Sequence, residues 1–271
     1  MAVSIQATID EMLAQKGEPR GPKDCWYVTD YGRCPRGVYL ERQGIANPNP
    51  PDERTMRVFK MGYMVEDFVV EALEKKGIIL SKQESVVYPE IGTRGRSDIV
   101  INDKGDAQLV EVKSMHSAGF HWRLKSGFKP LEHHEAQLLM YMGKLREKYT
   151  ESLKGCICYV SKDDLLIQQI PVQWNEEKYE LIIAHFKELD RCWKAQELPA
   201  PIAEVVFDEH KKKWQVNWKA KYCGYHALCT GDPEWELKAN AEVKRLNDLM
   251  EKPKKSKKVE KILEEITNIL E

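Results

Sequence analysis

Two short apolar stretches, residues 97–101 and 107–112, carry charged side chains inside runs that otherwise have the composition of buried strands. A turn-forming Asn-Asp-Lys-Gly segment separates them, which is typical of two adjacent strands of one sheet. Asp98 belongs to the first stretch, and Glu111 and Lys113 stand two residues apart at the end of the second. Because side chains alternate between the two faces of a strand, Glu111 and Lys113 project from the same face. The chain must therefore fold around a sheet that accommodates two carboxylates and an ammonium group.

The rest of the chain alternates between helical and strand-like apolar spacing, which is typical of a mixed α/β core. We expect helices at residues 4–15, 55–76, 131–148 and 175–196. We expect strands at residues 85–88, 97–101, 107–112, 155–160 and 166–171, of which the first three form one meander. Beyond residue 199 the chain is expected to be irregular, until a charged helical tail begins at Trp235. A lysine-rich hinge at 252–258 then precedes a last helix at 259–270.

These segments predict four regions. They are an N-terminal helix with a first cysteine segment (1–54), a core (55–198), a second cysteine segment (199–234) and the helical tail (235–271).

Composition narrows the class of protein. Of 271 residues, 42% are hydrophobic, which is ample for a packed core. The 42 Lys and Arg nearly balance the 43 Asp and Glu, so any surface that binds nucleic acid must be a local patch. No apolar run approaches the roughly 20 residues that span a bilayer, and the N-terminus lacks a signal pattern. We expect a cytoplasmic protein with no membrane partner.

The carboxylates Asp98 and Glu111 have the donor chemistry that Mg²⁺ or Mn²⁺ prefers. With the backbone carbonyl of Val112 and several waters, they could complete an octahedral site. The metal would lower the pKa of a bound water, and Lys113 would orient the nucleophile or stabilise developing charge, which is the chemistry of phosphodiester hydrolysis. The alternative is that Glu111 and Lys113 form only an exposed ion pair on an edge strand.

Two further pairs of residues stand four apart, so that each pair lies on one helical face: Gly62 with Glu66, and Gln137 with Tyr141. Together with the strand carboxylates and the lysine, they resemble the motifs of the PD-(D/E)XK nuclease superfamily and, within it, the RecB-like nucleases. Glu66 stands where many members have histidine.

The resemblance implies a restriction-endonuclease-like core with a mixed central sheet flanked by helices. It also implies that Glu66 is a metal ligand, and that Gln137 and Tyr141 are catalytic positioning or DNA-contacting residues. The alternatives are a solvated helix residue for Glu66 and a core-facing pair for Gln137 and Tyr141.

Seven cysteines are an odd number, which in a reducing compartment favours metal ligands and buried thiols over disulfides. Cys34, Cys223 and Cys229 resemble the cluster ligands of the iron-sulfur nucleases of this superfamily, which include the CRISPR-associated exonuclease of the Cas-four type. Those nucleases hold a [4Fe-4S] cluster with one N-terminal cysteine and three C-terminal ones, usually spaced C-x2-C-x5-C. The first of the three would fall at Ala220, so Cys25 is the replacement that we expect.

The resemblance therefore implies a cysteine-ligated cluster region that joins the N- and C-terminal segments. Four thiolates can also hold a structural Zn²⁺, and their spacing does not choose between the two. The remaining cysteines, Cys156, Cys158 and Cys192, are expected to be buried thiols.

A loop of aromatic and basic residues is expected between Lys113 and Lys129. Aromatic faces interleaved with cations suit single-stranded DNA, because each base can stack and each phosphate carries a charge. The alternative is a surface excursion with ordinary packing aromatics. We expect His133 and His134 on the solvated side of the following helix, and the alternative is that they enter the cleft. The DNA-contact candidates in the loop are His121, Trp122, Arg123 and Lys125.

The sequence thus predicts a Mg²⁺- or Mn²⁺-dependent DNA exonuclease, with or without endonuclease activity, that acts on single-stranded ends. Recombination, repair and CRISPR spacer acquisition would each suit it, and proteins of recombination or CRISPR acquisition would be its partners. The alternative is a catalytically inactive module of the same fold that binds DNA ends or recruits a partner.

Overall fold

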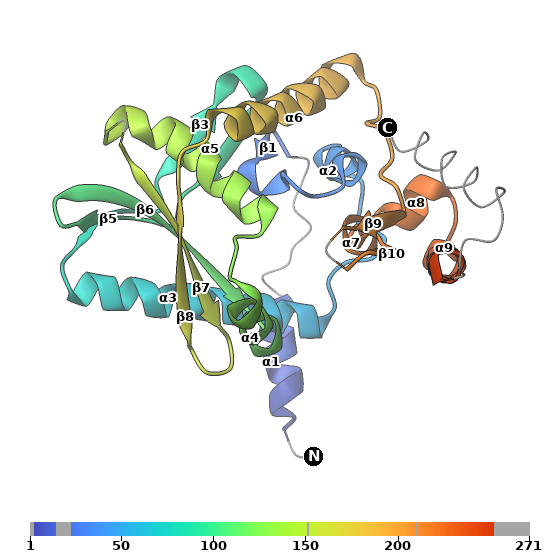
Figure 1. Cartoon of the computed structure of the whole chain (residues 1–271), viewed down its shortest axis with the longest axis horizontal. Helices are drawn as coiled ribbons and strands as arrows, with labels where there is room; N and C mark the ends of the chain where they lie inside the picture. Colours follow the sequence, from blue (N-terminus) through green and yellow to red (C-terminus); the bar gives the residue numbers. More distant parts are fainter. Residues whose placement is uncertain (1–2, 15–22, 151, 210, 252–271) are drawn as a thin grey trace. The chain divides into compact units, whose positions relative to one another are not determined.

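The computed structural model describes residues 3–14, 23–150, 152–209 and 211–251 (Figure 1). The chain forms two compact units, Met1–Pro199 and Ala200–Glu271. The predicted hinge at 252–258 and the predicted last helix at 259–270 lie outside the described residues. Among the helices of the described ranges, none is long and apolar enough to cross a membrane.

A five-stranded mixed sheet forms the centre of the first unit, in the order β2-β5-β6-β7-β8. Its strands are β2 (Ile79–Lys82), β5 (Ile99–Asp103), β6 (Asp106–Met115), β7 (Lys154–Ser161) and β8 (Ile167–Val172). Only the β6–β7 pair is parallel. A parallel pair needs a crossover connection, and α4 (Ser117–Ser126) and α5 (Glu132–Lys148) lie within it. The predicted mixed α/β class is confirmed.

Alternate strand residues point to opposite sides of this sheet, and apolar residues occupy both sets, so both faces are covered by helices. Helix α3 (Glu53–Lys75) starts at Asp52, whose side chain accepts a hydrogen bond from the Thr55 amide at 2.8 Å. On one face, Val65 and Val69 of α3 pack against Ile99, Ile101, Val110, Val112, Cys156, Cys158 and Val160. On the other face, α5 and the sheet share a second core that includes Val100, Leu109, Leu138, Ile157 and Tyr159.

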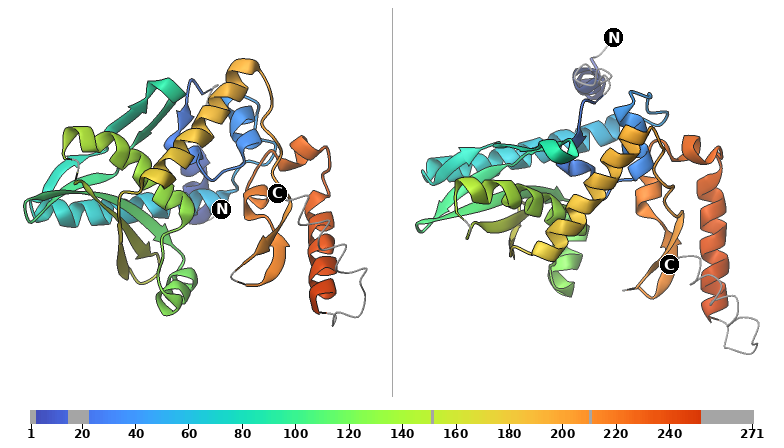
Figure 2. Two further views of the ribbon diagram at one scale, coloured as in Figure 1. Left: turned by 45° about the horizontal axis from the view of Figure 1, so that its top comes forward. Right: turned by 90° about the horizontal axis from the view of Figure 1, so that it is seen from above.

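Two further helices of the first unit are attached to these layers. Helix α1 (Ile5–Ala14) packs against α3, where Arg57 forms an ion pair with Asp10. Helix α6 (Glu176–Ala195) begins at Asn175 and packs against α5, and both views in Figure 2 place α5 and α6 side by side. Their apolar faces complete the core on the α5 side of the sheet.

A second, three-stranded sheet has the order β1-β4-β3 and comprises β1 (Trp26–Tyr27), β4 (Thr93–Arg96) and β3 (Ser85–Tyr88). The prediction of one meander is therefore wrong for residues 85–88. The 3-10 turn η2 (Pro89–Ile91) and Gly92, which has a φ of 56°, fold the chain back, so that β3 pairs with β4 and not with β5. The chain passes from one sheet to the other at residues 97–98, so Asp98 precedes β5 instead of lying within it.

An arginine between two indole rings holds β1 in place. The guanidinium carbon of Arg42, the last residue of α2 (Pro35–Arg42), lies 4.2 Å from the Trp26 ring centroid and 4.4 Å from that of Trp193. Its Nη2 donates a hydrogen bond to the Asp24 carbonyl oxygen at 3.0 Å. This stack fixes the start of η1 (Val28–Asp30), the short 3-10 turn that follows β1.

The predicted loop after Lys113 is wrong, because residues 117–126 form α4. His116 caps this helix, with its Nδ1 accepting a hydrogen bond from the Ala118 amide at 3.2 Å, and Phe120 anchors it in the core with 1% exposure. A single buried residue leaves no helical period in the sequence, which is why the pattern was not visible there.

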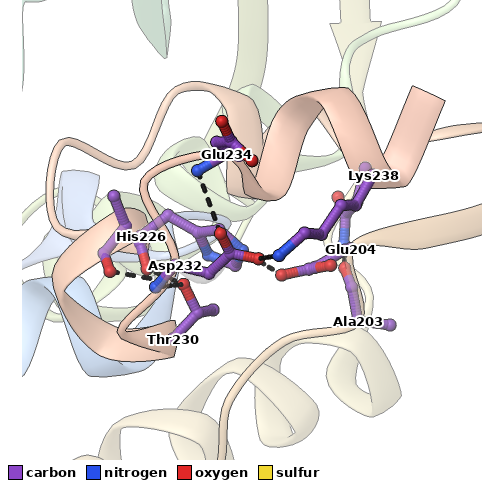
Figure 3. A network of polar contacts seen from close by, with 9 residues as sticks. Ala203, Glu204, His226, Thr230, Asp232, Glu234 and Lys238 are labelled. Atoms are coloured by element: carbon purple, nitrogen blue, oxygen red, sulfur yellow. Dashed lines mark hydrogen bonds and ion pairs between the residues drawn. The ribbon is translucent and has the colours of Figure 1, made fainter. Parts of the chain in front are cut away.

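The second unit is more regular than the sequence predicts. It contains β9 (Val205–Asp208) paired with β10 (Lys213–Val216), the short helices α7 (Trp218–Lys221) and α8 (His226–Thr230), and α9 (Trp235–Glu251). The predicted helical tail is confirmed from Trp235 to Glu251, and its remaining part lies outside the described residues. Figure 3 shows the polar contacts around His226, whose Nε2 lies 3.1 Å from Glu204 Oε1 while its carbonyl accepts a hydrogen bond from Thr230 at 3.0 Å.

Candidate active site

A cavity of about 320 Å³ opens in the first unit where both sheets, α3 and α5 meet. Six residues that the sequence analysis grouped by motif are in its wall: Glu66, Asp98, Glu111, Lys113, Gln137 and Tyr141. The other lining residues are Tyr27, Val28, Thr29, Tyr63, Asp67, Gln83, Gly95, Arg96, Ser97 and Val112.

Glu111, Lys113, Gln137 and Tyr141 form one connected hydrogen-bond group. Lys113 Nζ donates to Glu111 Oε1 at 2.8 Å and to Gln137 Oε1 at 2.9 Å. Gln137 Nε2 donates to Glu111 Oε1 at 2.6 Å and to the Tyr141 hydroxyl at 3.1 Å. Glu111 is 1% exposed on a central strand, so the alternative of an exposed ion pair on an edge strand is wrong.

Asp98 lies against this group from the junction between the two sheets. Its Oδ2 accepts a hydrogen bond from the Val112 amide at 2.8 Å. Burial, and then the neighbouring Glu111 carboxylate, raise the pKa of Asp98 to about 7, although Lys113 acts in the opposite direction. Two carboxyl groups so close together in a buried site favour either a shared proton or a bound cation.

Glu111 supplies the clearest sign of an incomplete site. Its Oε2 is buried and accepts no hydrogen bond from an N–H or hydroxyl group of the described residues, although Oε1 accepts two hydrogen bonds and the Asp98 carboxyl group lies close enough to share a hydrogen bond with Glu111. Burial raises the pKa of Glu111, and Lys113 only partly offsets this effect. An unpaired buried carboxylate oxygen is costly and is a suitable ligand for a hard cation. The side chains present therefore fit a divalent metal.

The metal ligands are not already gathered into a closed set. In the described part of the chain, no group of three or more His, Cys, Asp or Glu side chains lies close enough together to hold a metal ion. The Lys113 ammonium provides the nearest positive charge to the carboxylates, and they raise its pKa in spite of its burial. A cation would therefore bind Asp98 and Glu111 beside Lys113, and it would need further ligands from water, from backbone oxygens or from a movement of Glu66 toward the two carboxylates.

Glu66 faces the same cavity from α3. Burial is the first cause of its raised pKa, the Asp98 carboxylate is the second, and a side-chain hydrogen bond with Gln83 counters both. Glu66 is therefore partly buried and coupled to the site, unlike a fully solvated helix residue. The sequence analysis missed Gln83, which has a φ of 51° and whose amide donates to the Asp98 carbonyl oxygen at 2.8 Å.

The turn η1 forms a wall of the cavity that the sequence analysis also missed. Asp30 anchors it by accepting hydrogen bonds from the Tyr27 amide at 2.8 Å and from Arg33 Nη1 at 2.7 Å. A Cβ on Gly95 would lie 2.7 Å from Tyr141 Cε1 and 2.9 Å from Val28 Cγ2, so only glycine permits this close approach. No signal in the sequence links these segments, whereas Tyr63 and Asp67 could have been found by helical spacing from Glu66.

The four DNA-contact candidates lie on α4, and none is among the described residues that line the cavity. Trp122 is 61% exposed, and the Arg123 guanidinium carbon lies 5.9 Å from its ring centroid. His121 Nε2 lies 3.0 Å from Asp164 Oδ2. Lys125 is exposed in the last turn of the helix.

The cysteines fall into two classes. Cys156, Cys158 and Cys192 are buried, which confirms that prediction, and burial raises the pKa of both Cys156 and Cys158 to about 11. In the first unit, Cys34 is the N-cap of α2 and Cys25 directly precedes β1, where burial raises its pKa.

In the second unit, Cys223 lies between α7 and α8, and Cys229 lies in α8. Ala220, at the position expected for a ligand, is fully buried and packs with Trp235 and Ala239.

Ligation of Cys25, Cys34, Cys223 and Cys229 to a cluster stays a prediction. We expect the protein purified without oxygen to contain iron and inorganic sulfide and to be brown, because thiolate-bound iron-sulfur clusters absorb visible light. Replacing Cys34 with serine should remove the colour, whereas Cys156→Ser should leave it unchanged. A colourless protein with stoichiometric zinc would establish the zinc alternative.

The prediction for His134 is wrong, because this side chain does not lie on the solvated side of α5. It is partly buried, its Nδ1 is 3.0 Å from the Tyr159 hydroxyl, and burial lowers its pKa to about 2. His133 lies beside it, with the two ring centroids 4.3 Å apart.

Comparisons with known proteins find the fold but no family. No family model and no curated protein matches the chain. The crystal structure of SSO0001 matches with a TM-score of 0.52 and 18% identity, covering 84% of this chain and 98% of that one. LHK-Exo in complex with dAMP matches with a TM-score of 0.44 and 14% identity, over 64% and 89% of the two chains. LHK-Exo is an alkaline exonuclease from Laribacter hongkongensis. The chain therefore shares its fold with SSO0001.

Proposed function

We propose that this protein is a divalent-metal-dependent nuclease that hydrolyses phosphodiester bonds of DNA. The observation that carries the proposal is a pair of buried carboxyl groups, Asp98 and Glu111, in one cavity with Lys113 and Gln137. Glu111 Oε2 accepts no hydrogen bond there from an N–H or hydroxyl group of the described residues. Phosphoryl transfer needs carboxylates that bind a metal ion and positive groups that neutralise the negative charge of the transition state. The two carboxylates and the ammonium group of this cavity match both requirements.

The residues divide into those that would hold a cation and those that act on the substrate. Asp98 and Glu111 would hold a Mg²⁺ or Mn²⁺ ion, together with the Val112 carbonyl oxygen and, from α3, Glu66. When bound, this ion supplies positive charge that stabilises a phosphoryl transition state. Lys113 adds a second positive charge, which Glu111 Oε1 and Gln137 Oε1 hold at a fixed position.

Gln137 is the positioning residue of this site. It bonds to Glu111, Lys113 and Tyr141 at once, so it sets the spacing between the carboxylate and the ammonium group. Its own position is fixed because α5 is packed in the core on both sides of it, at Ala136 and Leu138. A site held by a rigid helix keeps its geometry without reorganisation during the reaction.

The proposed substrate is DNA with single-stranded ends, cleaved exonucleolytically in recombination, repair or spacer acquisition. Trp122 is exposed on α4, the helix that follows β6, and the Arg123 guanidinium group lies near its ring. This pair supports the proposed substrate class. An indole and a guanidinium group together can stack on a base and contact a phosphate. Every base offers a face for stacking and every nucleotide carries a phosphate, so cleavage would depend little on base identity.

A cleavage assay tests the proposal. Single-stranded oligonucleotides labelled at the 5′ or the 3′ end are incubated with Mn²⁺, with Mg²⁺ or with EDTA, and the products are separated by size. We expect metal-dependent cleavage, and we expect Asp98→Asn to reduce kcat/KM by about 10²-fold or more, because it removes a charge at the site where transition-state charge is stabilised.

Asp103→Asn is the matched control, because Asp103 ends strand β5, which begins directly after Asp98, but is not among the described lining residues of the cavity. It should cleave like the wild type. An inactive wild type that still binds DNA ends would favour the non-catalytic alternative. Equal activity of the wild type and Asp98→Asn would show that cleavage does not use this site.

A further inference from the structure

His134 extends the active-site face of α5 by one turn. It stands three residues before Gln137 and seven before Tyr141, so with 3.6 residues per turn the three side chains lie on one side of the helix. Gln137 and Tyr141 line the cavity. His134 therefore lies at the N-terminal end of that same face, where the proposed function has assigned it no role.

The sheet places Tyr159, which is hydrogen-bonded to His134, next to Lys113, while His134 itself is not among the described lining residues of the cavity. Lys113 of β6 and Tyr159 of β7 are paired residues of the parallel ladder, so their side chains point to the same face. The Tyr159 hydroxyl lies 3.0 Å from His134 Nδ1. The positive charge of Lys113 is also among the causes that lower the pKa of His134.

We take the tautomer of His134 in which Tyr159 is the donor. The Leu131 amide donates to the Tyr159 hydroxyl at 2.9 Å, and the hydroxyl hydrogen can in turn be donated to His134. Donation to Nδ1 makes Nδ1 an acceptor and leaves the ring hydrogen on Nε2. No described residue forms a hydrogen bond with this Nε2–H group.

The pKa of His134 is lowered to about 2, so the ring is neutral near neutral pH. Burial is the main cause of its low pKa, followed by the positive charge of Lys113 and the influence of His133 and Arg123. A neutral imidazole donates a hydrogen bond through Nε2 but does not give up that proton near neutral pH. His134 is thus suited to binding and unsuited to acid–base catalysis.

We propose that His134 Nε2–H donates a hydrogen bond to a non-bridging oxygen of a substrate phosphodiester beside Lys113. Phosphate oxygens at neutral pH accept hydrogen bonds and donate none, so an unpartnered N–H donor beside an ammonium group matches their chemistry. Because His134 is neutral, it adds a hydrogen bond to the phosphate without placing a second positive charge close to that of Lys113. The inference rests on the proposed function and defines a phosphate-binding subsite next to the carboxylates.

Two substitutions separate the two nitrogens of the ring. In His134→Asn, the side-chain oxygen can take the place of Nδ1 and accept from Tyr159, but no donor reaches the position of Nε2. In His134→Gln, the amide nitrogen takes the place of Nε2. We expect His134→Asn to raise KM for single-stranded DNA about tenfold or more, as for the loss of a hydrogen bond to a charged group, with a smaller change in kcat. His134→Gln should restore KM to near the wild-type value.

Steady-state kinetics gives the split between KM and kcat, and fluorescence anisotropy of a labelled oligonucleotide in EDTA gives binding without hydrolysis. Thermal unfolding of each variant identifies folding defects. If the asparagine variant does not fold, Tyr159→Phe, which removes the lock on the tautomer, should raise KM in its place.

The opposite pattern overturns the inference: an asparagine variant like the wild type and an impaired glutamine variant would mean that His134 serves only to hold Tyr159. A limb of the pH profile of kcat/KM that disappears in both variants would show that His134 transfers a proton, and would also overturn it. If the wild type cleaves DNA and both variants match it, this inference alone fails. If the wild type neither cleaves nor binds DNA, the proposed function fails and the subsite with it.

Discussion

Replacing Glu111 with glutamine should abolish metal-dependent cleavage without destabilising the fold. Glutamine keeps the oxygen that accepts from Lys113 and Gln137, and it removes the buried charge whose Oε2 accepts no hydrogen bond from an N–H or hydroxyl group of the described residues. A buried, incompletely paired carboxylate is retained at a cost to stability. We therefore expect kcat/KM to fall by about 10²-fold or more. The free energy of unfolding should stay the same or rise by up to about 1 kcal/mol.

Single-turnover cleavage and urea denaturation, both in EDTA-treated and in Mn²⁺-supplemented buffer, measure the two effects. Asp106→Asn, a carboxylate on the same strand with 59% of its side chain exposed, is the matched control and should change neither. Manganese should raise the unfolding midpoint of the wild type and not that of Glu111→Gln, because binding to the native state stabilises it. A glutamine variant that unfolds more easily and still cleaves would contradict both the metal site and the unpaired oxygen.

Replacing Lys113 with methionine should destabilise the folded protein, unlike Glu111→Gln, and should also stop cleavage. Lys113 is the only ion-pair partner that the structure gives Glu111 among the described residues, and it also offsets the charge on Asp98. Its removal leaves two carboxylates in a buried site, and breaking a buried pair in this way costs about 3 kcal/mol. The variant should also lose about 10²-fold or more in kcat/KM, as when one group that stabilises transition-state charge is lost.

The stability cost of Lys113→Met should depend on pH. The folded protein holds the pKa of Asp98 near 7 and that of Glu111 above its ordinary value, so the native state binds more protons than the unfolded state between roughly pH 4 and 7. Stability arising from this difference is present below pH 4 and is lost as the pH rises through the folded pKa. Without Lys113, the pKa values of Asp98 and Glu111 in the folded protein rise further, so the loss of stability continues to higher pH.

Urea denaturation in EDTA at pH 5 and pH 8 should therefore show a larger destabilisation of Lys113→Met at pH 8. Lys154→Met is the matched control, because Lys154 pairs with Asp106 at the surface, where such pairs contribute little. An equal loss of stability for the two variants, or a larger loss at pH 5, would show that Lys113 does not compensate buried carboxylates.

The sequence by itself determined the elements that follow from local periodicity. Alternation along residues 107–112 predicted the strand that carries Glu111 and Lys113, and a spacing of four placed Gln137 and Tyr141 on one face of α5. Both rules concern neighbours along the chain, where strand and helix geometry allows few alternatives. The expectation that Glu66, Asp98 and this face share one region came from a resemblance, and all of them line one cavity.

Only the tertiary structure decided the environment of each of these groups. It placed η1 against Gly95, some 65 residues away in sequence, and separated β3 from the sheet of β5 and β6. It also partly buried His134, which the sequence analysis assigned to the solvent, because Tyr159 on a strand after α5 supplies its hydrogen-bond partner. Burial and charge coupling depend on contacts between distant segments, and no local period in the sequence encodes those contacts.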